Sequence, residues 1–97
     1  MSNSEKILTQ LRKIKPALQE HYGLTQIALF GSHSREEASA ESDIDLLIDL
    51  SKNTSADFFN IAFQLQDLFH PRKVDIVTRN GIKPSYYRSI EQDLIYV

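Results

Sequence analysis

Leu29-Phe30-Gly31-Ser32, followed after ten residues by Asp43-Ile44-Asp45, is the stretch that decides the fold. An apolar run ends in a glycine-serine turn, and two carboxylates then lie on one face of the next strand, because side chains alternate along a strand. Their Cα atoms are expected about 6.5 Å apart. Two carboxylates this close can share one cation, so the stretch predicts a metal site beside a turn that can hold an anion.

A helix is predicted before this stretch, over about residues 4–22. Ser2 and Glu5 have the spacing of a capping box, and Gly23 is the expected C-cap. Because proline breaks the interior of a helix, Pro16 predicts two helical pieces that meet near residues 14–15. Apolar residues at helical spacing predict one buried stripe, made of Ile7, Leu11, Ile14 and Leu18.

Beyond Gly31 the chain alternates between strand and helix patterns. Ser32 is a candidate N-cap for a short helix, and Thr54 with Asp57 can cap a longer one that ends before Pro71. We expect Phe58, Phe59 and Phe63 of the longer helix to pack in the core, unless the small core cannot cover one of them and that side chain meets a partner instead. The other predicted elements are strands at 25–30, 43–50 and 73–78, a turn at Asn80-Gly81, a helix from Pro84 to about Gln92 and an edge strand at 94–97.

Composition narrows the class of protein. A chain of 97 residues has room for one small domain, so we expect a single domain over residues 1–97. The formal net charge of −2 gives no general attraction to nucleic acid or anionic lipid. Cysteine is absent, which excludes a disulfide scaffold and a thiol nucleophile. No basic leader or long apolar run occurs, and a cytoplasmic protein is expected.

A third carboxylate extends the predicted metal site. In the strand at 73–78, Val74 and Ile76 face inward, so Asp75 faces the opposite side and can join Asp43 and Asp45. Without a cation, two carboxylates about 4 Å apart repel by about 1 to 4 kcal/mol, and Mg²⁺, which prefers hard oxygen ligands, relieves this. Two Mg²⁺ ions about 3.5 to 4 Å apart would polarise a phosphate and assist an attacking hydroxyl. Asp75 is the natural general base.

The glycine-serine turn supplies features that favour phosphate. Gly31 has no Cβ to obstruct an approaching phosphate, and Ser32 offers a hydroxyl next to backbone amides. Arg35 can grip the same phosphates with its planar guanidinium. These three residues are the predicted nucleotide-binding residues.

Together, Gly31-Ser32, ten intervening residues and Asp43-Ile44-Asp45-Leu46-Leu47-Ile48 resemble the signature of the polymerase-beta-type nucleotidyltransferases, in particular the minimal nucleotidyltransferases. The resemblance covers nearly the whole chain. It implies an α+β fold with a small mixed sheet of three to four strands flanked by helices. It also implies that Asp43, Asp45 and Asp75 are catalytic metal ligands and that Ser32 binds phosphate.

The resemblance further implies a partner. Minimal nucleotidyltransferases are commonly antitoxins of a HEPN toxin, an RNase, and transfer AMP from ATP to a tyrosine of that toxin within a hetero-oligomer. Family members that modify antibiotics or extend RNA usually add a domain for the acceptor, which favours a protein acceptor here. Two alternatives stay open: an antitoxin that neutralises the toxin by binding alone, and transfer to a small molecule or an RNA end.

The chain departs from the family pattern at two positions of the turn. Where the family usually reads Gly-Ser-x-Ala-Arg-Gly, Ser34 replaces alanine and Glu36 replaces glycine, while Arg35 is kept. A carboxylate facing a triphosphate would oppose nucleotide binding, so Glu36 is expected to weaken the phosphate site unless the turn directs it to solvent.

Overall fold

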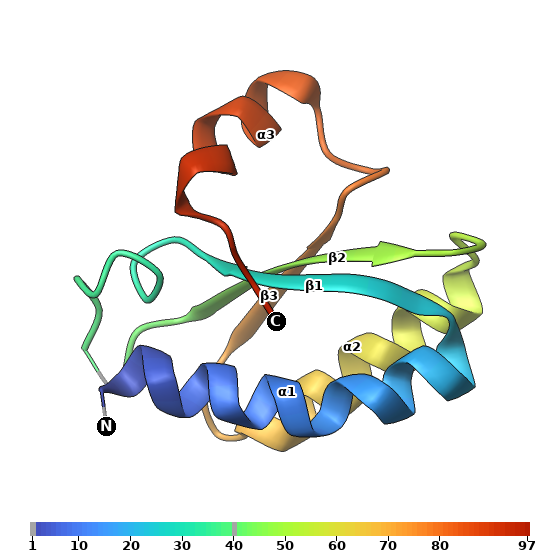
Figure 1. Cartoon of the computed structure of the whole chain (residues 1–97), viewed down its shortest axis with the longest axis horizontal. Helices are drawn as coiled ribbons and strands as arrows, with labels where there is room; N and C mark the ends of the chain where they lie inside the picture. The colour runs from blue at the N-terminus through green and yellow to red at the C-terminus, as the bar shows by residue number, and fades with distance from the viewer. Residues whose placement is uncertain (1, 40) are drawn as a thin grey trace.

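The computed structural model describes residues 2–39 and 41–97, in which a four-stranded sheet lies between helices (Figure 1). The strands are β1 (Leu24–Phe30), β2 (Ile44–Leu50), β3 (Val74–Thr78) and β4 (Ile95–Tyr96). The helices are α1 (Asn3–Tyr22), α2 (Ser55–Phe69) and α3 (Pro84–Ile90), with a 3₁₀ turn, η1 (Glu91–Asp93), directly after α3. Within the described residues, no helix combines the length and the hydropathy needed to cross a membrane.

The sheet is mixed, with the strand order β3-β2-β1-β4. β1 runs antiparallel to both of its neighbours, whereas β2 and β3 are parallel. Parallel neighbours need a long crossover, and α2 supplies it. The expected α+β fold with a small mixed sheet is therefore confirmed, including the short edge strand near the C-terminus.

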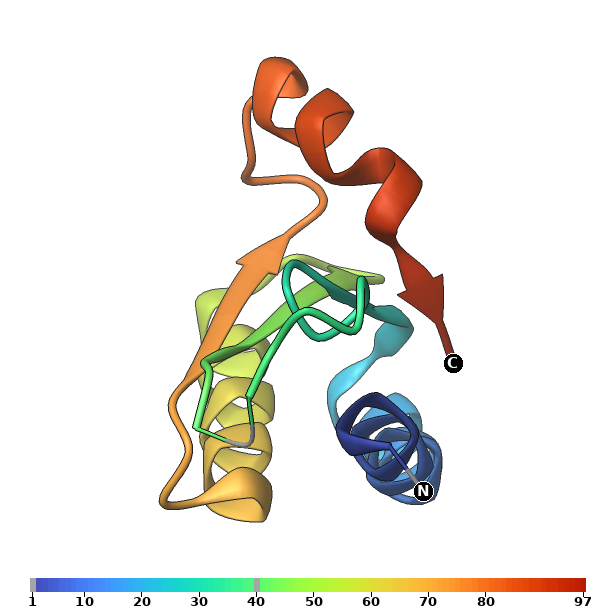
Figure 2. The ribbon, with the colours of Figure 1, turned by 90° about the vertical axis from the view of Figure 1, so that its left-hand side faces the viewer.

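The two faces of the sheet have different covers (Figure 2). α1 and α2 lie against one face, and α3 stands on the other side. The main core lies under α1 and α2 and includes Ile7, Leu11, Leu18, Ile27, Leu29, Ile44, Leu46, Ile48, Ile61 and Leu65. A smaller cluster under α3 contains Phe30, Leu47 and Ile90. Alternation along β2 thus places apolar residues in the main core and leaves the other face for the smaller cluster and the carboxylates.

The predicted helix caps are confirmed. The Ser2 hydroxyl accepts a hydrogen bond from the backbone N–H of Glu5 at 3.2 Å, and the Thr54 hydroxyl accepts one from Asp57 at 3.2 Å. Gly23 ends α1 in the left-handed conformation, with φ 70°. The capping residues of the sequence therefore predict correctly where α1 begins and ends and where α2 begins.

The predicted break at Pro16 is wrong, because α1 is one helix with Pro16 inside it. A proline removes one N–H donor and leaves the carbonyl four residues earlier, that of Arg12, without its helical partner. Pro16 and Arg12 are both exposed, so water can reach this position. The buried stripe of α1 lies on the other side and packs without interruption.

The predicted short helix from Ser32 is also wrong: residues 31–36 form successive turns. The N–H of Arg35 reaches the carbonyl of Gly31 at 3.3 Å, as in one helical turn. Glu36 then adopts φ 59°, and the N–H of Glu37 bonds to the carbonyl of Ser32 at 2.9 Å. This pattern closes a helix C-terminus, so the segment ends after a single turn.

The expectation for the phenylalanines of α2 needs correction. Phe58 packs partly against the core, but Phe59 is 68% exposed and Phe63 is 72% exposed. α2 packs with its Ile61, Leu65 and Phe69 face, and residues 59 and 63 lie away from that face.

β3 is an edge strand, and the side chain of Gln66 covers its first donor. The backbone N–H of Val74 donates to Oε1 of Gln66 at 3.1 Å. The amide nitrogen of the same side chain donates to the carbonyl of Arg72 at 2.6 Å. Gln66 thus pairs with the beginning of β3 as a neighbouring strand would.

Candidate active site

The three predicted aspartates occupy neighbouring backbone positions at the beginnings of two adjacent strands. Asp43 directly precedes β2, Asp45 is the second residue of β2, and Asp75 is the second residue of β3. The parallel register pairs Asp45 with Asp75, and adjacent strands lie about 4.8 Å apart. All three therefore belong to the sheet face opposite α1 and α2.

Asp45 is the carboxylate most affected by this arrangement. Burial raises its pKa above the ordinary value, and the negative charges of Asp75 and then Asp43 raise it further. His33 and Arg35 act in the opposite direction but do not cancel these effects. A divalent cation would relieve the same repulsion, which is the electrostatic property expected of a metal-binding carboxylate.

Lys73 is a site residue that the sequence reasoning missed. Its Nζ lies 4.0 Å from Oδ2 of Asp43 and 3.6 Å from Oδ1 of Asp75. Lys73 precedes Asp75 by two residues, and residues two apart share a face of a strand. The same alternation that grouped the carboxylates could therefore have identified Lys73.

Gly31 lies directly against Asp45. A Cβ added to Gly31 would be 2.3 Å from Oδ2 of Asp45, and Gly31 has φ 75°. A side chain at this position would be strained and would displace the carboxylate. Gly31 therefore admits the carboxylate of Asp45, a role beyond the predicted approach to phosphate.

The remaining turn residues lie close to this pair. Ser32 follows Gly31 at the end of β1 and is half-buried. The Ser34 hydroxyl donates to the Gly31 carbonyl at 2.9 Å, which helps to hold the turn closed. The Ser4 hydroxyl donates to Oε1 of Glu36 at 3.3 Å, so Glu36 is directed to the start of α1. A carboxylate is favourable at a helix N-terminus, and Glu36 has a partner there.

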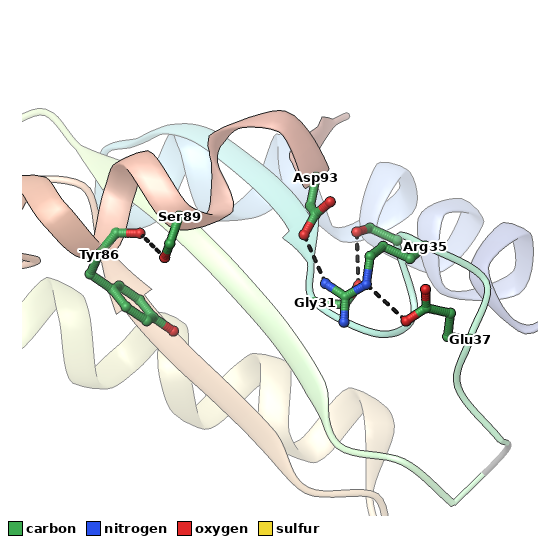
Figure 3. A network of polar contacts seen from close by, with 7 residues as sticks. Gly31, Arg35, Glu37, Tyr86, Ser89 and Asp93 are labelled. Carbon is green, nitrogen blue, oxygen red and sulfur yellow. Dashed lines mark hydrogen bonds and ion pairs between the residues drawn. The ribbon is translucent and has the colours of Figure 1, made fainter.

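Arg35 is bound by two carboxylates (Figure 3). Its Nε lies 3.0 Å from Oε1 of Glu37, and its Nη1 lies 2.8 Å from Oδ2 of Asp93. The hydrogen bond to Glu37, and next that to Asp93, raises the pKa of Arg35. The guanidinium therefore ties the turn to η1, and a grip on phosphate would require it to exchange one of these partners.

His33 is a buried residue of the turn, and its contact with Arg72 was not predicted. It is 1% exposed, and its Nε2 lies 2.8 Å from Nη2 of Arg72. The same Nε2 lies 3.2 Å from the carbonyl oxygen of Ser42. His33 and Arg72 thus connect the glycine-serine turn to the segment before β3, a contact between residues far apart in sequence.

The donor set fits a hard divalent cation in its chemistry. Three carboxylates on neighbouring backbone positions are the oxygen ligands that Mg²⁺ prefers. Within the described residues, no three acidic or histidine side chains converge as a ready metal cluster. Lys73 spans Asp43 and Asp75, and Asp45 lies against Gly31, so the carboxylates would have to turn inward to share an ion.

This fold and motif occur in known proteins. A family profile described as a nucleotidyltransferase domain matches residues 11–97. The chain belongs to the nucleotidyltransferase family. The chain is therefore a nucleotidyltransferase, and the resemblance to this family is confirmed.

Two relatives of this nucleotidyltransferase carry more specific names. One, from Methanocaldococcus jannaschii, is named "Putative protein adenylyltransferase MJ0128"; it is 41% identical over 99 residues, and the match covers 100% of both chains. The other, "Protein adenylyltransferase MntA" of Thermococcus cleftensis, is 32% identical over 98 residues, with 100% of this chain and 98% of the relative covered.

Two solved structures share the fold of this nucleotidyltransferase. One, described as a "putative minimal nucleotidyltransferase", aligns with a TM-score of 0.77 and 27% identity, covering 98% of this chain and 95% of its own. The other, a toxin-antitoxin complex with AMP-PNP, aligns with a TM-score of 0.66 and 23% identity, covering 97% of this chain and 71% of its own. The roles of the individual site residues stay predictions.

Proposed function

We propose that this nucleotidyltransferase transfers AMP from ATP to a tyrosine hydroxyl of a HEPN-family toxin and thereby acts as its antitoxin. The observation that carries the proposal is the register that pairs Asp45 with Asp75, next to Asp43 and against Gly31. Relatives named protein adenylyltransferases support a protein acceptor. The toxin-antitoxin complex of the same fold supports a toxin as that protein.

The residues divide the reaction between them. Gly31 and Ser32 hold the triphosphate, and Asp43, Asp45 and Asp75 would hold Mg²⁺. When bound, Mg²⁺ would neutralise the charge of the phosphates and polarise the α-phosphate.

In the transfer itself, the tyrosine oxygen forms a bond to the α-phosphorus. The bond from that phosphorus to the bridging oxygen breaks, and pyrophosphate leaves. Asp75 accepts the tyrosine proton. Most of the acceleration comes from positioning and charge neutralisation.

The test is co-expression with a candidate HEPN-family toxin from the same organism, followed by mass spectrometry of the toxin. We expect the toxin to gain the mass of one AMP, and the double variant Asp43→Asn with Asp45→Asn to abolish that gain. Asp49→Asn is the matched control, because Asp49 lies on the same face of β2 but about 13 Å from Asp45. Transfer that survives the double variant would show that the metal assignment is wrong.

Neutralisation by binding alone is the second candidate. The observation that favours it is that Arg35, a predicted phosphate ligand, is held by Glu37 and Asp93. If a variant with asparagine at 43, 45 and 75 still rescues growth from the toxin, binding is sufficient. Labelled ATP in cell extract separates both from transfer to RNA or a metabolite, because the label then appears outside the protein fraction.

A further inference from the structure

We call Asp43, Asp45 and Asp75 the carboxylate cluster. Among the described residues, Lys73 is the only lysine or arginine that forms an ion pair with this cluster. It contacts Asp43 and Asp75 and leaves Asp45 outside these ion pairs. The side chain of Lys73 is 68% exposed, and those of Asp43 and Asp75 are 49% and 46% exposed. The contact is therefore open to water and can be exchanged at little cost.

The backbone fixes where this ammonium can reach. The carbonyl of Lys73 accepts a hydrogen bond from the N–H of Ile44 at 2.9 Å. The backbone of Lys73 is therefore bound to β2 at the residue between Asp43 and Asp45. Its stem is long and flexible, with three donors at its end. The backbone anchor keeps the ammonium near the carboxylates, while the stem lets it change partners.

The charges imply a competition. A divalent cation at the carboxylates would lie close to the Lys73 ammonium, and like charges repel. A nucleoside triphosphate changes this balance, because its phosphates supply further oxygen ligands for Mg²⁺ and offer the ammonium a new anionic partner.

We propose that Lys73 is the resident counter-ion of the carboxylate cluster, which weakens the binding of divalent metal to the nucleotide-free site and transfers to the triphosphate when nucleotide and metal enter together. The inference rests on the proposed function, since it takes the carboxylates as the metal ligands. Lys73 is thus a positioning residue that couples metal binding to nucleotide binding. By linkage, each of the two ligands then tightens the other.

The test compares Lys73→Met with Lys52→Met. Lys52 is an exposed lysine just beyond the opposite end of β2, so this control removes the same charge away from the site. Mn²⁺ is the metal probe, and free Mn²⁺ is counted by electron paramagnetic resonance, with and without a non-hydrolysable ATP analogue. Thermal melting checks that each variant is folded.

Without nucleotide, we expect Lys73→Met to bind Mn²⁺ about two- to fivefold more tightly than the wild type, because one repelling, solvent-exposed charge is gone. With the analogue, that advantage should disappear, and the variant should bind the analogue more weakly. Lys73→Arg keeps the charge and should behave like the wild type. Asp45→Asn, in the same assay, should weaken Mn²⁺ binding both in the wild type and when combined with Lys73→Met or Lys73→Arg.

Equal Mn²⁺ affinity of Lys73→Met and Lys52→Met would overturn this inference, and AMP transfer by the wild type would still support the proposed function. A wild type that binds no Mn²⁺ with the analogue and transfers no AMP would overturn both. The two failures are therefore distinguishable.

Discussion

Gly31 combines two demands on one residue. Its φ of 75° is strained for any residue with a side chain, and a Cβ would lie 2.3 Å from Oδ2 of Asp45. The turn and the carboxylate therefore depend on each other: the backbone reverses where the carboxylate needs room. The sequence alone indicated the turn, but not that Asp45 fills the space beside it.

Glu36 also adopts a positive φ, but it carries a side chain. The family pattern has glycine here, and the structure gives this position φ 59°, a conformation that glycine adopts without strain. The pattern therefore reflects the backbone of the turn. Glu36 accepts that strain, and its side chain bonds to Ser4.

In the absence of metal, the ionised carboxylate of Asp45 is expected to lower the free energy of unfolding. Burial, followed by Asp75 and Asp43, raises its pKa above 3.8, so the folded protein keeps a proton that the unfolded chain loses. The free energy of unfolding then falls as pH rises through this interval, and the ionised carboxylate is unfavourable above it. Without metal, Asp45→Asn should therefore melt a few degrees higher than the wild type at pH 7.

The advantage of Asp45→Asn should vanish as the pH falls below 3.8, where Asp45 is protonated in both folded and unfolded states. Thermal melts from pH 3 to pH 8 measure this, with Asp49→Asn as the control on the same strand. A variant that melts lower than the wild type at pH 7 would contradict the prediction.

At the scale of elements, α2 offers a direct comparison of two positions. Ile61 is fully buried, whereas Phe63 is 72% exposed. Ile61→Ala should lower the free energy of unfolding by about 2 to 5 kcal/mol, since it leaves a cavity. Phe63→Ala should change it by no more than about 0.5 kcal/mol. Urea denaturation measures both; a large loss for Phe63→Ala would mean that this side chain is buried in an assembly.

Local signals predicted the elements, and contacts between distant residues were missed. Gly23 and Thr54 ended and began helices as expected, because a cap depends on residues a few positions away. Alternation along β2 and β3 predicted that Asp45 and Asp75 lie on one face, and the strand pairing adds that they are side by side in a parallel register. Pro16 misled because its exposure depends on what α1 packs against. The His33 contact with Arg72 joins segments with no shared pattern.

At the scale of the whole molecule, the ion pair between Arg35 and Asp93 joins the glycine-serine turn to the C-terminal segment. Arg35 binds Asp93 of η1, between α3 and the edge strand β4 (Figure 3). Arg35→Ala should therefore raise amide hydrogen exchange severalfold in residues 31–37 and 91–97, while β1 and β2 stay protected. Arg12→Ala, an exposed arginine of α1, is the control.

High salt should bring the wild type closer to Arg35→Ala in this experiment, because exposed ion pairs are screened. Unchanged exchange in both segments would show that this ion pair does not hold the C-terminal segment, which then depends on the packing of Ile90 and the pairing of β4 with β1.

The pairing of Gln66 with the start of β3 has a consequence for the protein in concentrated solution. An open strand edge is a template on which further chains can stack into fibrils. β3 is such an edge, yet the first donor it offers, the N–H of Val74, is already occupied by Gln66. We therefore expect this edge to resist self-association where it begins, immediately beside Asp75, so that an acceptor protein can approach the carboxylate without competing copies of the chain.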